Sequence, residues 1–258
     1  MTGTPLPGGF VSTPVRVGDT VRRAPSPRAE YVRRLLDFLA AAGWDGAPRH
    51  LGTDDEGREV LSYLPGHVAW EPPAQQPPAV GSDEGVAEVA ALVREFHDLT
   101  AGTPLAEGHE VVCHNDLSPK NTVYRARPGG DATDGNLHPV ALLDWDLAAP
   151  GRRVHDVAHV CWQFLRLGPS ASDPRAAGAR VRLVCDAYGL GDSDRAELIE
   201  VVLWWQERCW RGIEAEAEAG EPHAVTLRAT GVLDSVRHAA HWVAAHREEL
   251  EAGVRHGG

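Results

Sequence analysis

The sequence has few cysteines and none in a metal-binding spacing. Four occur along 258 residues, Cys113, Cys161, Cys185 and Cys209, and no CxxC pair is present. Each lies in an apolar or helical context, which predicts buried free thiols in a reducing cytoplasm rather than a disulfide framework. The chain also lacks a Gly-x-Ser-x-Gly elbow, so a hydrolase that uses zinc or a serine nucleophile is not indicated.

Long apolar runs and excess positive charge are missing as well. No apolar run approaches the about 20 residues needed to span a bilayer, and MTGTPLPGGF has neither the basic nor the apolar region of a signal peptide. The formal net charge is −12, whereas a general nucleic-acid binder normally has a basic surface. We therefore expect a cytoplasmic protein without membrane or nucleic-acid partners. Its oligomeric state is left open.

The chain changes character along its length. Residues 1–65 predict a small β-rich lobe with a hairpin that turns at Gly18-Asp19 and one helix, in which Tyr31, Leu35, Phe38 and Leu39 recur at helical spacing. Residues 66–82 are proline-rich and polar, as in an extended connector. Residues 83–258 begin with an amphipathic helix and, after a few short strands, are helical nearly throughout, with a last helix predicted over 222–252. The predicted class is α+β: a bilobal fold with a small β-rich N-terminal lobe and a larger, mostly helical C-terminal lobe.

A polar loop between two apolar strands stands out in VVCHNDLSPKNTVYR, which contains Asp116 and Asn121. A second signal is Asp144, directly after the apolar strand of VALLDWD. The segment between them is rich in Gly, Asp, Asn and Pro, which is typical of a hairpin loop. Such a hairpin would bring the three side chains to one end of a small sheet. Their oxygens are of the kind that hold Mg²⁺ together with phosphate groups.

These two motifs resemble those of a known family. HNDLSPKN resembles the H-x-D-x-x-x-x-N catalytic loop, and LLDWD lies where kinase-like folds have their magnesium aspartate. The chain thus resembles the aminoglycoside phosphotransferase and choline kinase-like family, relatives of the protein kinases, from about Gly8 to at least Trp162. The resemblance implies a protein-kinase-like fold and Mg²⁺-dependent transfer of the γ-phosphate of ATP or GTP to a hydroxyl group.

The resemblance also implies roles for individual residues of the second lobe. Asp116 would be the catalytic base, and His114 would brace the catalytic loop without reacting. Asn121 and Asp144 would be the two magnesium ligands. Asp156 would support the catalytic loop by hydrogen-bonding its backbone, although a carboxylate at a helix start is also favoured by the helix macrodipole.

Two segments of the small lobe resemble nucleotide-contacting parts of the family. GGFVST, residues 8–13, resembles the short glycine loop over the phosphates, although a GG pair is also common in plain turns. LSYLPG, residues 61–66, resembles the strand-to-hinge segment whose backbone pairs with the purine edge, which leaves ATP against GTP undecided. The residues implied in nucleotide binding by these segments are Gly9, Ser12, Thr13, Ser62, Tyr63 and Leu64.

An arginine stands where kinases have a phosphate-binding lysine. Strand alternation turns either Arg22 or Arg23 into the cleft, and we favour Arg23. Arginine is always charged and can bind phosphate bidentately, so it is able to fill this role. Its partner would be Glu30 in the next helix, with an exposed first-turn carboxylate as the alternative. Asp146 is expected near the metal or the substrate, or as a structural cap, and Lys120 as a solvated loop lysine.

The acceptor substrate is not named by any residue. Residues 196–221 carry glutamates and tryptophans at helical spacing, which would suit a polycationic sugar, but such glutamates usually form a solvated face and such tryptophans a core. We expect a small-molecule kinase with a role in antibiotic resistance, acting on an aminoglycoside-type antibiotic or related metabolite. The alternatives are a kinase of Ser/Thr in a natural-product precursor peptide and a catalytically idle nucleotide-binding relative acting as a partner protein.

Overall fold

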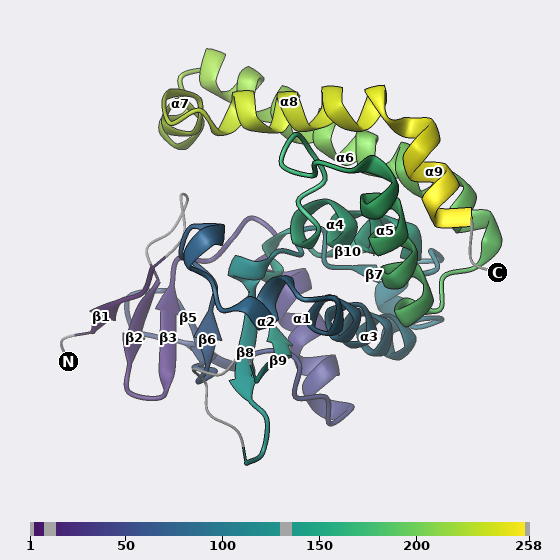
Figure 1. The fold of residues 1–258 in the computed structure, drawn as a ribbon. Helices are drawn as coiled ribbons and strands as arrows, with labels where there is room; N and C mark the ends of the chain where they lie inside the picture. The colour runs from purple at the N-terminus through teal and green to yellow at the C-terminus, as the bar shows by residue number, and fades with distance from the viewer. Residues whose placement is uncertain (1–2, 8–13, 130–135, 256–258) are drawn as a thin grey trace. The chain divides into compact units, whose positions relative to one another are not determined.

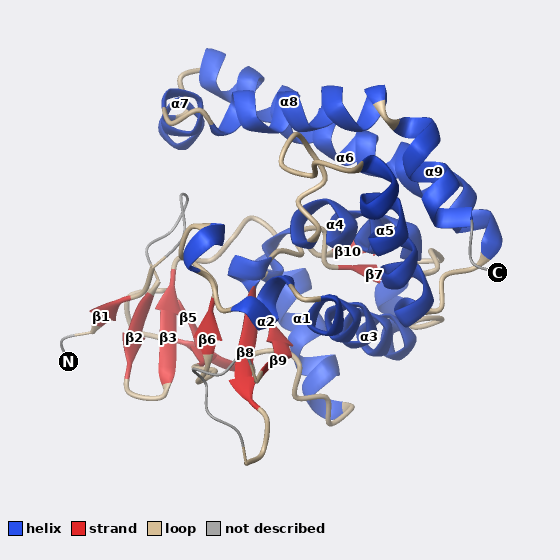
Figure 2. Ribbon diagram, viewed as in Figure 1, coloured by secondary structure: helices blue, strands red, loops and turns tan. Residues whose placement is uncertain are grey.

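The chain divides into two compact units, Met1–Arg153 and Val154–Gly258 (Figure 1). The structure is a computed structural model, and it describes residues 3–7, 14–129 and 136–255. All described strands lie in the first unit, whereas the second unit is helical, as the colours of Figure 2 show. The predicted α+β class is thereby confirmed. The predicted lobe boundaries at residues 65 and 82 are a finer division, and they stay a prediction.

A five-stranded antiparallel sheet with the order β1-β2-β3-β5-β4 begins the first unit. The predicted hairpin at Gly18 is present, with φ +61° at this glycine, and joins β2 to β3. Helix α1 (Ala29–Ala41) follows and buries Leu35 and Leu39, as its helical spacing predicted, together with Val32 and Leu36. The strands are β1 (Thr4–Pro5), β2 (Val15–Val17), β3 (Thr20–Arg23), β4 (His50–Thr53) and β5 (Glu59–Ser62).

The connector after β5 is more structured than its composition indicated. It contains strand β6 (His67–Val68) and the short helix α2 (Pro78–Gly81), and helix α3 (Asp83–Thr100) follows with Ser82 as its N-cap. The connector turns at Gly66, which has φ +154°. A Cβ at Gly66 would lie 2.5 Å from Val123 Cγ1, so only glycine allows the chain to pass this closely.

A hairpin formed by β8 (Thr122–Ala126) and β9 (Leu137–Leu142) carries the polar motifs. Its register pairs Thr122 with Leu142, so the start of β8 lies beside the end of β9. Strand β6 completes this sheet in the order β6-β8-β9, and β7 (Val111–Cys113) pairs separately with β10 (Ala149–Gly151). The predicted hairpin therefore brings Asn121 next to the residues that follow β9.

The second unit consists of α4 without its first residue, and of α5 to α9. The prediction of one helix over 222–252 is wrong. The chain breaks at Gly231, because a left-handed residue with φ +79° cannot continue a helix. It breaks again at His246, whose φ of −113° and ψ of 22° are not helical. The helices are α4 (Arg153–Phe164), α5 (Pro174–Tyr188), α6 (Asp192–Glu218), α7 (Pro222–Ala229), α8 (Val232–Ala245) and α9 (Arg247–Arg255).

In helix α6, the expected tryptophan core is not observed at Trp204, and the expected solvated glutamate face is partly paired. Trp204 is 46% exposed rather than part of a core, and its ring stacks on His155 at 5.6 Å. Glu200 and Glu214 are on the surface, but each forms an ion pair, with Arg247 and Arg237 respectively. The acidic face of α6 is therefore partly neutralised within its own unit.

The cysteines are free thiols, as their spacing predicted. None of the four cysteines forms a disulfide, and Cys209 alone among them is only half-buried. Among the described residues, no helix combines the length and the apolar character needed to cross a bilayer.

Helices α5 and α9 cross at a pair of glycines. A Cβ at Gly178 would lie 2.7 Å from the carbonyl oxygen of Leu250, and one at Gly253 would lie 2.7 Å from the Cα of Gly178. Both distances are shorter than real Cβ contacts and involve backbone atoms, which cannot rotate away. The close packing of these two helices therefore depends on the absence of side chains at the crossing.

We expect Gly178→Ala to lower the free energy of unfolding by about 1–3 kcal/mol, because the added methyl overpacks the crossing. Gly212→Ala is the matched control. Gly212 is also helical, but nothing lies within 4 Å of its ideal Cβ, so this change should stabilise by about 0.5–1 kcal/mol. Urea unfolding monitored by circular dichroism measures both. Equal effects of the two substitutions would contradict a close helix crossing.

Candidate active site

The loop after β7 holds Asp116 through the side chain of Asn121. The Asn121 amide nitrogen donates to the backbone oxygen of Asp116 at 2.9 Å and to its carboxylate Oδ2 at 2.8 Å. The Leu143 N–H in turn donates to the Asn121 carbonyl at 2.8 Å, which ties this loop to the residue before Asp144. Because both hydrogen bonds to Asp116 use the amide nitrogen of Asn121, its side-chain oxygen remains as an acceptor for a ligand or a cation.

The His114 side chain also links the loop that carries Asp116 to the residue before Asp144. It is fully buried, its Nε2 lies 2.9 Å from the carbonyl oxygen of Leu143, and the Asp116 N–H donates to its Nδ1 at 3.3 Å. These partners assign the ring proton to Nε2, since a carbonyl oxygen can only accept. The ring also packs against Trp145, with centroids 4.6 Å apart. His114 therefore has structural contacts on both nitrogens.

Two residues beside these motifs have left-handed backbone conformations. Asn115 has φ +64° and Asp144 has φ +61°. Asparagine and aspartate adopt this region at lower cost than other side chains, which fits the residue types found here. The Asn115 amide is also held by the carbonyl of Leu147 at 3.0 Å. Unfavourable backbone conformations of this kind concentrate at functional sites, where surrounding contacts maintain them.

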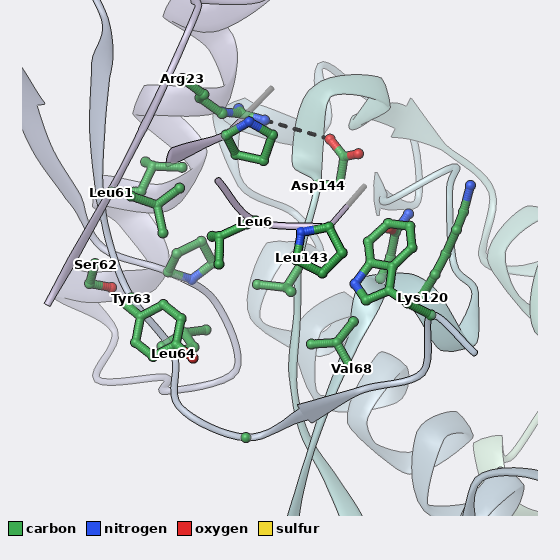
Figure 3. Close-up of a pocket in the computed structure, with 17 residues that line it drawn as sticks. Leu6, Arg23, Leu61, Ser62, Tyr63, Leu64, Val68, Lys120, Leu143 and Asp144 are labelled. Carbon is green, nitrogen blue, oxygen red and sulfur yellow. Dashed lines mark ion pairs between the residues drawn. The ribbon is translucent and has the colours of Figure 1, made fainter. Parts of the chain in front are cut away.

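A pocket of about 310 Å³ opens beside these residues within the first unit. Its apolar wall includes Val21 of β3, Leu61 of β5 and Leu143 (Figure 3). Asp144 and Arg23 lie together at one side, joined by the ion pair that Figure 3 marks with a dashed line. The pocket therefore combines an apolar wall with charged groups, as small-molecule sites commonly do.

The segment after β5 forms another wall and presents backbone groups. Ser62, Tyr63 and Leu64 all line the pocket. The Ser62 and Tyr63 N–H groups are used, since they donate to the carbonyls of Arg49 and Asp19 at 2.9 Å each. The Leu64 N–H has no hydrogen-bond partner among the residues that the structure describes. It is available to a ligand in the pocket.

Arg23, rather than Arg22, lines the pocket. Its Nε donates to Glu59 at 3.1 Å, and its two terminal nitrogens donate to Asp146 at 3.1 and 2.6 Å. Arg22 has the other orientation and pairs with Asp54 at 3.3 Å. Burial disfavours the charged form of Arg23, but the Asp146 and Glu59 carboxylates outweigh it, so that the arginine pKa is raised.

The expected pairing of Arg23 with Glu30 is wrong. Glu30 lies in the first turn of α1, its side chain is 73% exposed, and it pairs with Arg33 at 2.6 Å. Residues three apart on a helix are neighbours, which makes Arg33 the closer partner. The β3–β5 register instead places Glu59 opposite Arg23. Sequence reasoning missed Glu59, whose only signal is a carboxylate within the apolar strand pattern EVL.

The remaining predicted site residues lie in other parts of the chain. Gly9, Ser12 and Thr13 lie outside the described residues. Asp156 is fully buried in the first turn of α4 and belongs to the second unit. Its proposed support of the catalytic loop stays a prediction. Lys120 is exposed, as expected of a solvated lysine, and it also lines the pocket.

Two carboxylates of the site, Asp116 and Asp144, have a raised pKa and hold their protons more tightly than usual. Burial raises the pKa of Asp116, and Lys120 and Asn121 only partly oppose it. The pKa of Asp144 is also raised, by burial and then by the nearby charges of Asp146 and Asp116. Such shifts express an uncompensated negative charge. Together with the side-chain oxygen of Asn121, these all-oxygen donors fit a hard divalent cation such as Mg²⁺.

Comparison with known proteins matches this site to a family. Residues 80–199, which contain the loop with Asp116 and the strand before Asp144, match the profile of the phosphotransferase enzyme family. This segment is therefore similar to the phosphotransferase enzyme family. The expected resemblance and the expected enzyme class, a phosphotransferase acting on alcohol groups, are thereby confirmed at the level of the family.

Relatives extend the similarity over the rest of the chain. The trifolitoxin immunity protein of Rhizobium leguminosarum bv. trifolii is 29% identical over 96% of this chain and 97% of its own length. Among solved structures, a choline/ethanolamine kinase family protein from Mesorhizobium loti has a TM-score of 0.61 at 16% identity, over 100% of this chain and 93% of that chain. An ADP-bound aminoglycoside phosphotransferase has a TM-score of 0.54 at 12% identity, covering 94% of each chain. The protein-kinase-like fold of the phosphotransferase family is thus confirmed.

The raised pKa of Asp116 predicts that this residue costs stability. A carboxyl whose pKa is higher in the folded than in the unfolded chain favours folding at low pH, and that contribution is lost as the pH rises through the raised pKa. Asp116→Asn removes the charge and keeps an oxygen to accept from Asn121. We expect it to raise the melting temperature at pH 7, by a margin that shrinks as the pH falls toward about 4, the ordinary aspartate range.

Thermal melts between pH 4 and 8 measure this difference. Asp19→Asn is the control, because the Asp19 side chain is fully exposed and the same charge change should have little effect there. If Asp116→Asn melted below the unsubstituted protein at pH 7, the charge on Asp116 would be stabilising, and the assigned direction of its pKa shift would be wrong.

Proposed function

We propose that this phosphotransferase transfers the γ-phosphate of ATP or GTP to a hydroxyl group of an antibiotic-type small molecule. The observation that carries the proposal is the juxtaposition of Asp116, Asn121 and Asp144. They come together where β8 begins and β9 ends, and Asn121 and Asp144 line a pocket with an apolar wall. Phosphoryl transfer depends mainly on positioning and charge stabilisation, and these groups supply both.

The nucleotide base would lie against Val21, Leu61 and Leu143. Its polar edge would accept a hydrogen bond from the Leu64 N–H, the unused donor of this wall. The phosphates would then extend toward Arg23 and Lys120, the cations that line the same pocket. This orientation is supported by the pocket's own division into an apolar wall and a charged side.

Asn121 and Asp144 would hold Mg²⁺ through their side-chain oxygens, with Asn121 kept in place by its two hydrogen bonds to Asp116. Bound Mg²⁺ supplies neutralisation of the phosphate charge during transfer. Asp116 would accept the proton of the acceptor hydroxyl while the hydroxyl oxygen bonds to the γ-phosphorus. The bond between the γ-phosphorus and the β–γ bridging oxygen breaks at the same time, and this oxygen leaves with the nucleoside diphosphate. The raised pKa of Asp116 suits this role, because it makes the carboxylate a better base.

The curated relative supports a toxic acceptor. Its name assigns it immunity against trifolitoxin, and the match covers 96% of this chain. We therefore propose that the acceptor is a toxin or antibiotic with a free hydroxyl, which phosphorylation inactivates. An aminoglycoside is one such acceptor, and a serine or threonine in a natural-product peptide is another.

A second candidate is a binding protein without turnover, which protects by capturing its ligand. Two observations favour it. The relative is named for immunity rather than for catalysis. In addition, Arg23, which stands for the phosphate-binding lysine, is engaged by Asp146 and Glu59. The joint presence of Asp116, Asn121 and Asp144 favours the enzyme, because capture alone requires no such arrangement.

A thermal-shift titration with ATP and GTP, each with and without Mg²⁺, tests the nucleotide site. A ligand that binds the folded state raises the melting temperature, and 100 times its Kd in free ligand adds about 2.7 kcal/mol. We expect a Mg²⁺-dependent shift with at least one nucleotide, and Asp144→Ala should abolish the Mg²⁺ dependence. A shift that Asp144→Ala leaves unchanged would remove Asp144 as a metal ligand, and no shift at all would contradict the nucleotide site.

Loss of the base separates catalysis from capture. With an acceptor found by screening hydroxyl-bearing antibiotics and serine-containing peptides, Asp116→Asn should lower kcat by about 10²–10⁴-fold, the usual contribution of a general base. Nucleotide affinity should be retained. Phosphate incorporation followed by mass spectrometry measures the rate. Full activity of Asp116→Asn would rule out the proposed mechanism, and protection from the toxin that survives this change would favour capture.

A further inference from the structure

Both donor edges of the Arg23 guanidinium are occupied. Nε donates to Glu59 at 3.1 Å, and the two terminal nitrogens form a bidentate pair with Asp146 at 3.1 and 2.6 Å. The Arg23 side chain is only 10% exposed. The terminal edge is the one that binds phosphate bidentately, because its two parallel N–H groups match two oxygens of one phosphate. A nucleotide phosphate and Asp146 therefore compete for the same atoms.

Glu59 is a fixed partner of Arg23. It lies on β5 directly opposite Arg23 on β3, and the two residues are a register pair of the antiparallel sheet. Its side chain is 7% exposed, and its position is set by the hydrogen bonds between the two strands. Cross-strand neighbours of this kind stay in contact as long as the sheet is intact. Glu59 thus holds Nε without using the terminal edge.

Asp146 is the exchangeable partner. It lies in the single 3₁₀ turn η4 (Trp145–Leu147), and its side chain is 31% exposed. This turn starts at Asp144, whose left-handed backbone already departs from regular structure. The carboxylate of Asp144 is also close, with Oδ1 3.6 Å from an Arg23 nitrogen. A single turn can shift its side chain at far lower cost than a strand within a sheet.

We propose that Asp146 occupies the phosphate-binding edge of Arg23 until nucleotide phosphates displace it, while Glu59 holds the guanidinium in the pocket throughout. This inference rests on the proposed nucleotide site. Asp146 then acts as a specificity-determining residue, because a ligand without phosphate cannot replace its bidentate pair. Glu59 acts as the positioning residue for Arg23, in the place that the sequence assigned to Glu30.

The charge balance explains why such an exchange is favourable. In the ligand-free site, the Asp146 carboxylate accepts from the terminal N–H groups of a buried guanidinium, which would otherwise lack acceptors at a high cost. A phosphate supplies the same negative charge and the same two acceptors. The partly exposed Asp146 side chain can then return to water, whereas a buried one would remain desolvated. The exchange therefore replaces one charged pair with another of the same geometry.

Calorimetric titration of ATP and adenosine in EDTA tests the exchange without any contribution from metal binding. Asp146→Asn keeps the size of the competing side chain but removes its charge, which weakens its pair with Arg23. ATP affinity should therefore rise by about threefold to tenfold, because the phosphate displaces a weaker competitor. Glu59→Gln should lower ATP affinity by a similar factor, because the guanidinium loses its charged anchor. Adenosine affinity should stay within twofold in both variants, because adenosine does not contact Arg23.

Glu30→Gln is the matched control for Glu59→Gln. It is the same substitution at an exposed residue that pairs with Arg33, and it should leave the affinity for both ligands unchanged. Retained adenosine binding shows that each variant is folded. If Glu59→Gln does not fold, Asp146→Asn still decides the exchange, because its side chain is partly exposed on a turn.

Three results would overturn the inference. ATP affinity lowered by Asp146→Asn in EDTA would mean that Asp146 supports rather than competes with phosphate. Equal losses in Glu59→Gln and Glu30→Gln would remove Glu59 as the positioning residue. Equal affinity of the unsubstituted protein for ATP and adenosine would leave the nucleotide pocket in place but show that no phosphate reaches Arg23. Binding of neither ligand would instead contradict the proposed function, and the exchange with it.

Discussion

The crowding of carboxylates around one buried guanidinium is the constraint on which the rest of the site depends. Four carboxylates and two cations gather at the ends of β3, β5, β8 and β9, which leaves an excess of negative charge. Arg23 alone contacts three of the carboxylates. Burial raises the pKa values of Asp116 and Asp144, and the neighbouring negative charges raise them further. A divalent cation and a nucleotide carry charges of opposite sign, and together they can enter such a site without leaving either charge unmatched. The groups of this site are those Asp116, Asp144, Asp146 and Glu59 carboxylates and the Arg23 and Lys120 cations.

The scaffold brings these groups together through strand register rather than through sequence proximity. The β8–β9 hairpin fixes Asn121 against Leu143 through the Leu143 N–H, and His114 adds a second link to Leu143 through its carbonyl oxygen. The β3–β5 pair fixes Arg23 against Glu59. Each link uses backbone groups or fully buried atoms, so the site is held by rigid elements while its ligand-binding atoms stay accessible. The left-handed conformations of Asn115 and Asp144 are tolerated within this framework.

Stability and function oppose each other at Asp116. An ionised carboxylate that is buried next to other acids disfavours folding, yet its elevated proton affinity is what a general base requires. Asn121 reduces this cost by donating to the carboxylate, and Lys120 reduces it by its charge. The second unit differs in this respect, since its α5–α9 crossing depends on close backbone packing at Gly178 and Gly253.

The sequence by itself determined several elements of the first unit and the motif. The hairpin at Gly18, the helix with Leu35 and Leu39, and the β8–β9 hairpin follow from local periodicity and turn residues, which act over a few positions. The spacing of Asp116, Asn121 and Asp144 was readable because one hairpin joins them. The tertiary structure alone decided the partners of Arg23. Glu59 lies 36 residues away and Asp146 lies 123 away. Glu30, which is nearer to Arg23 in the sequence, instead pairs with Arg33 on its own helix. Register between distant strands and the position of a single turn are set by packing of the whole unit, and no local pattern encodes them.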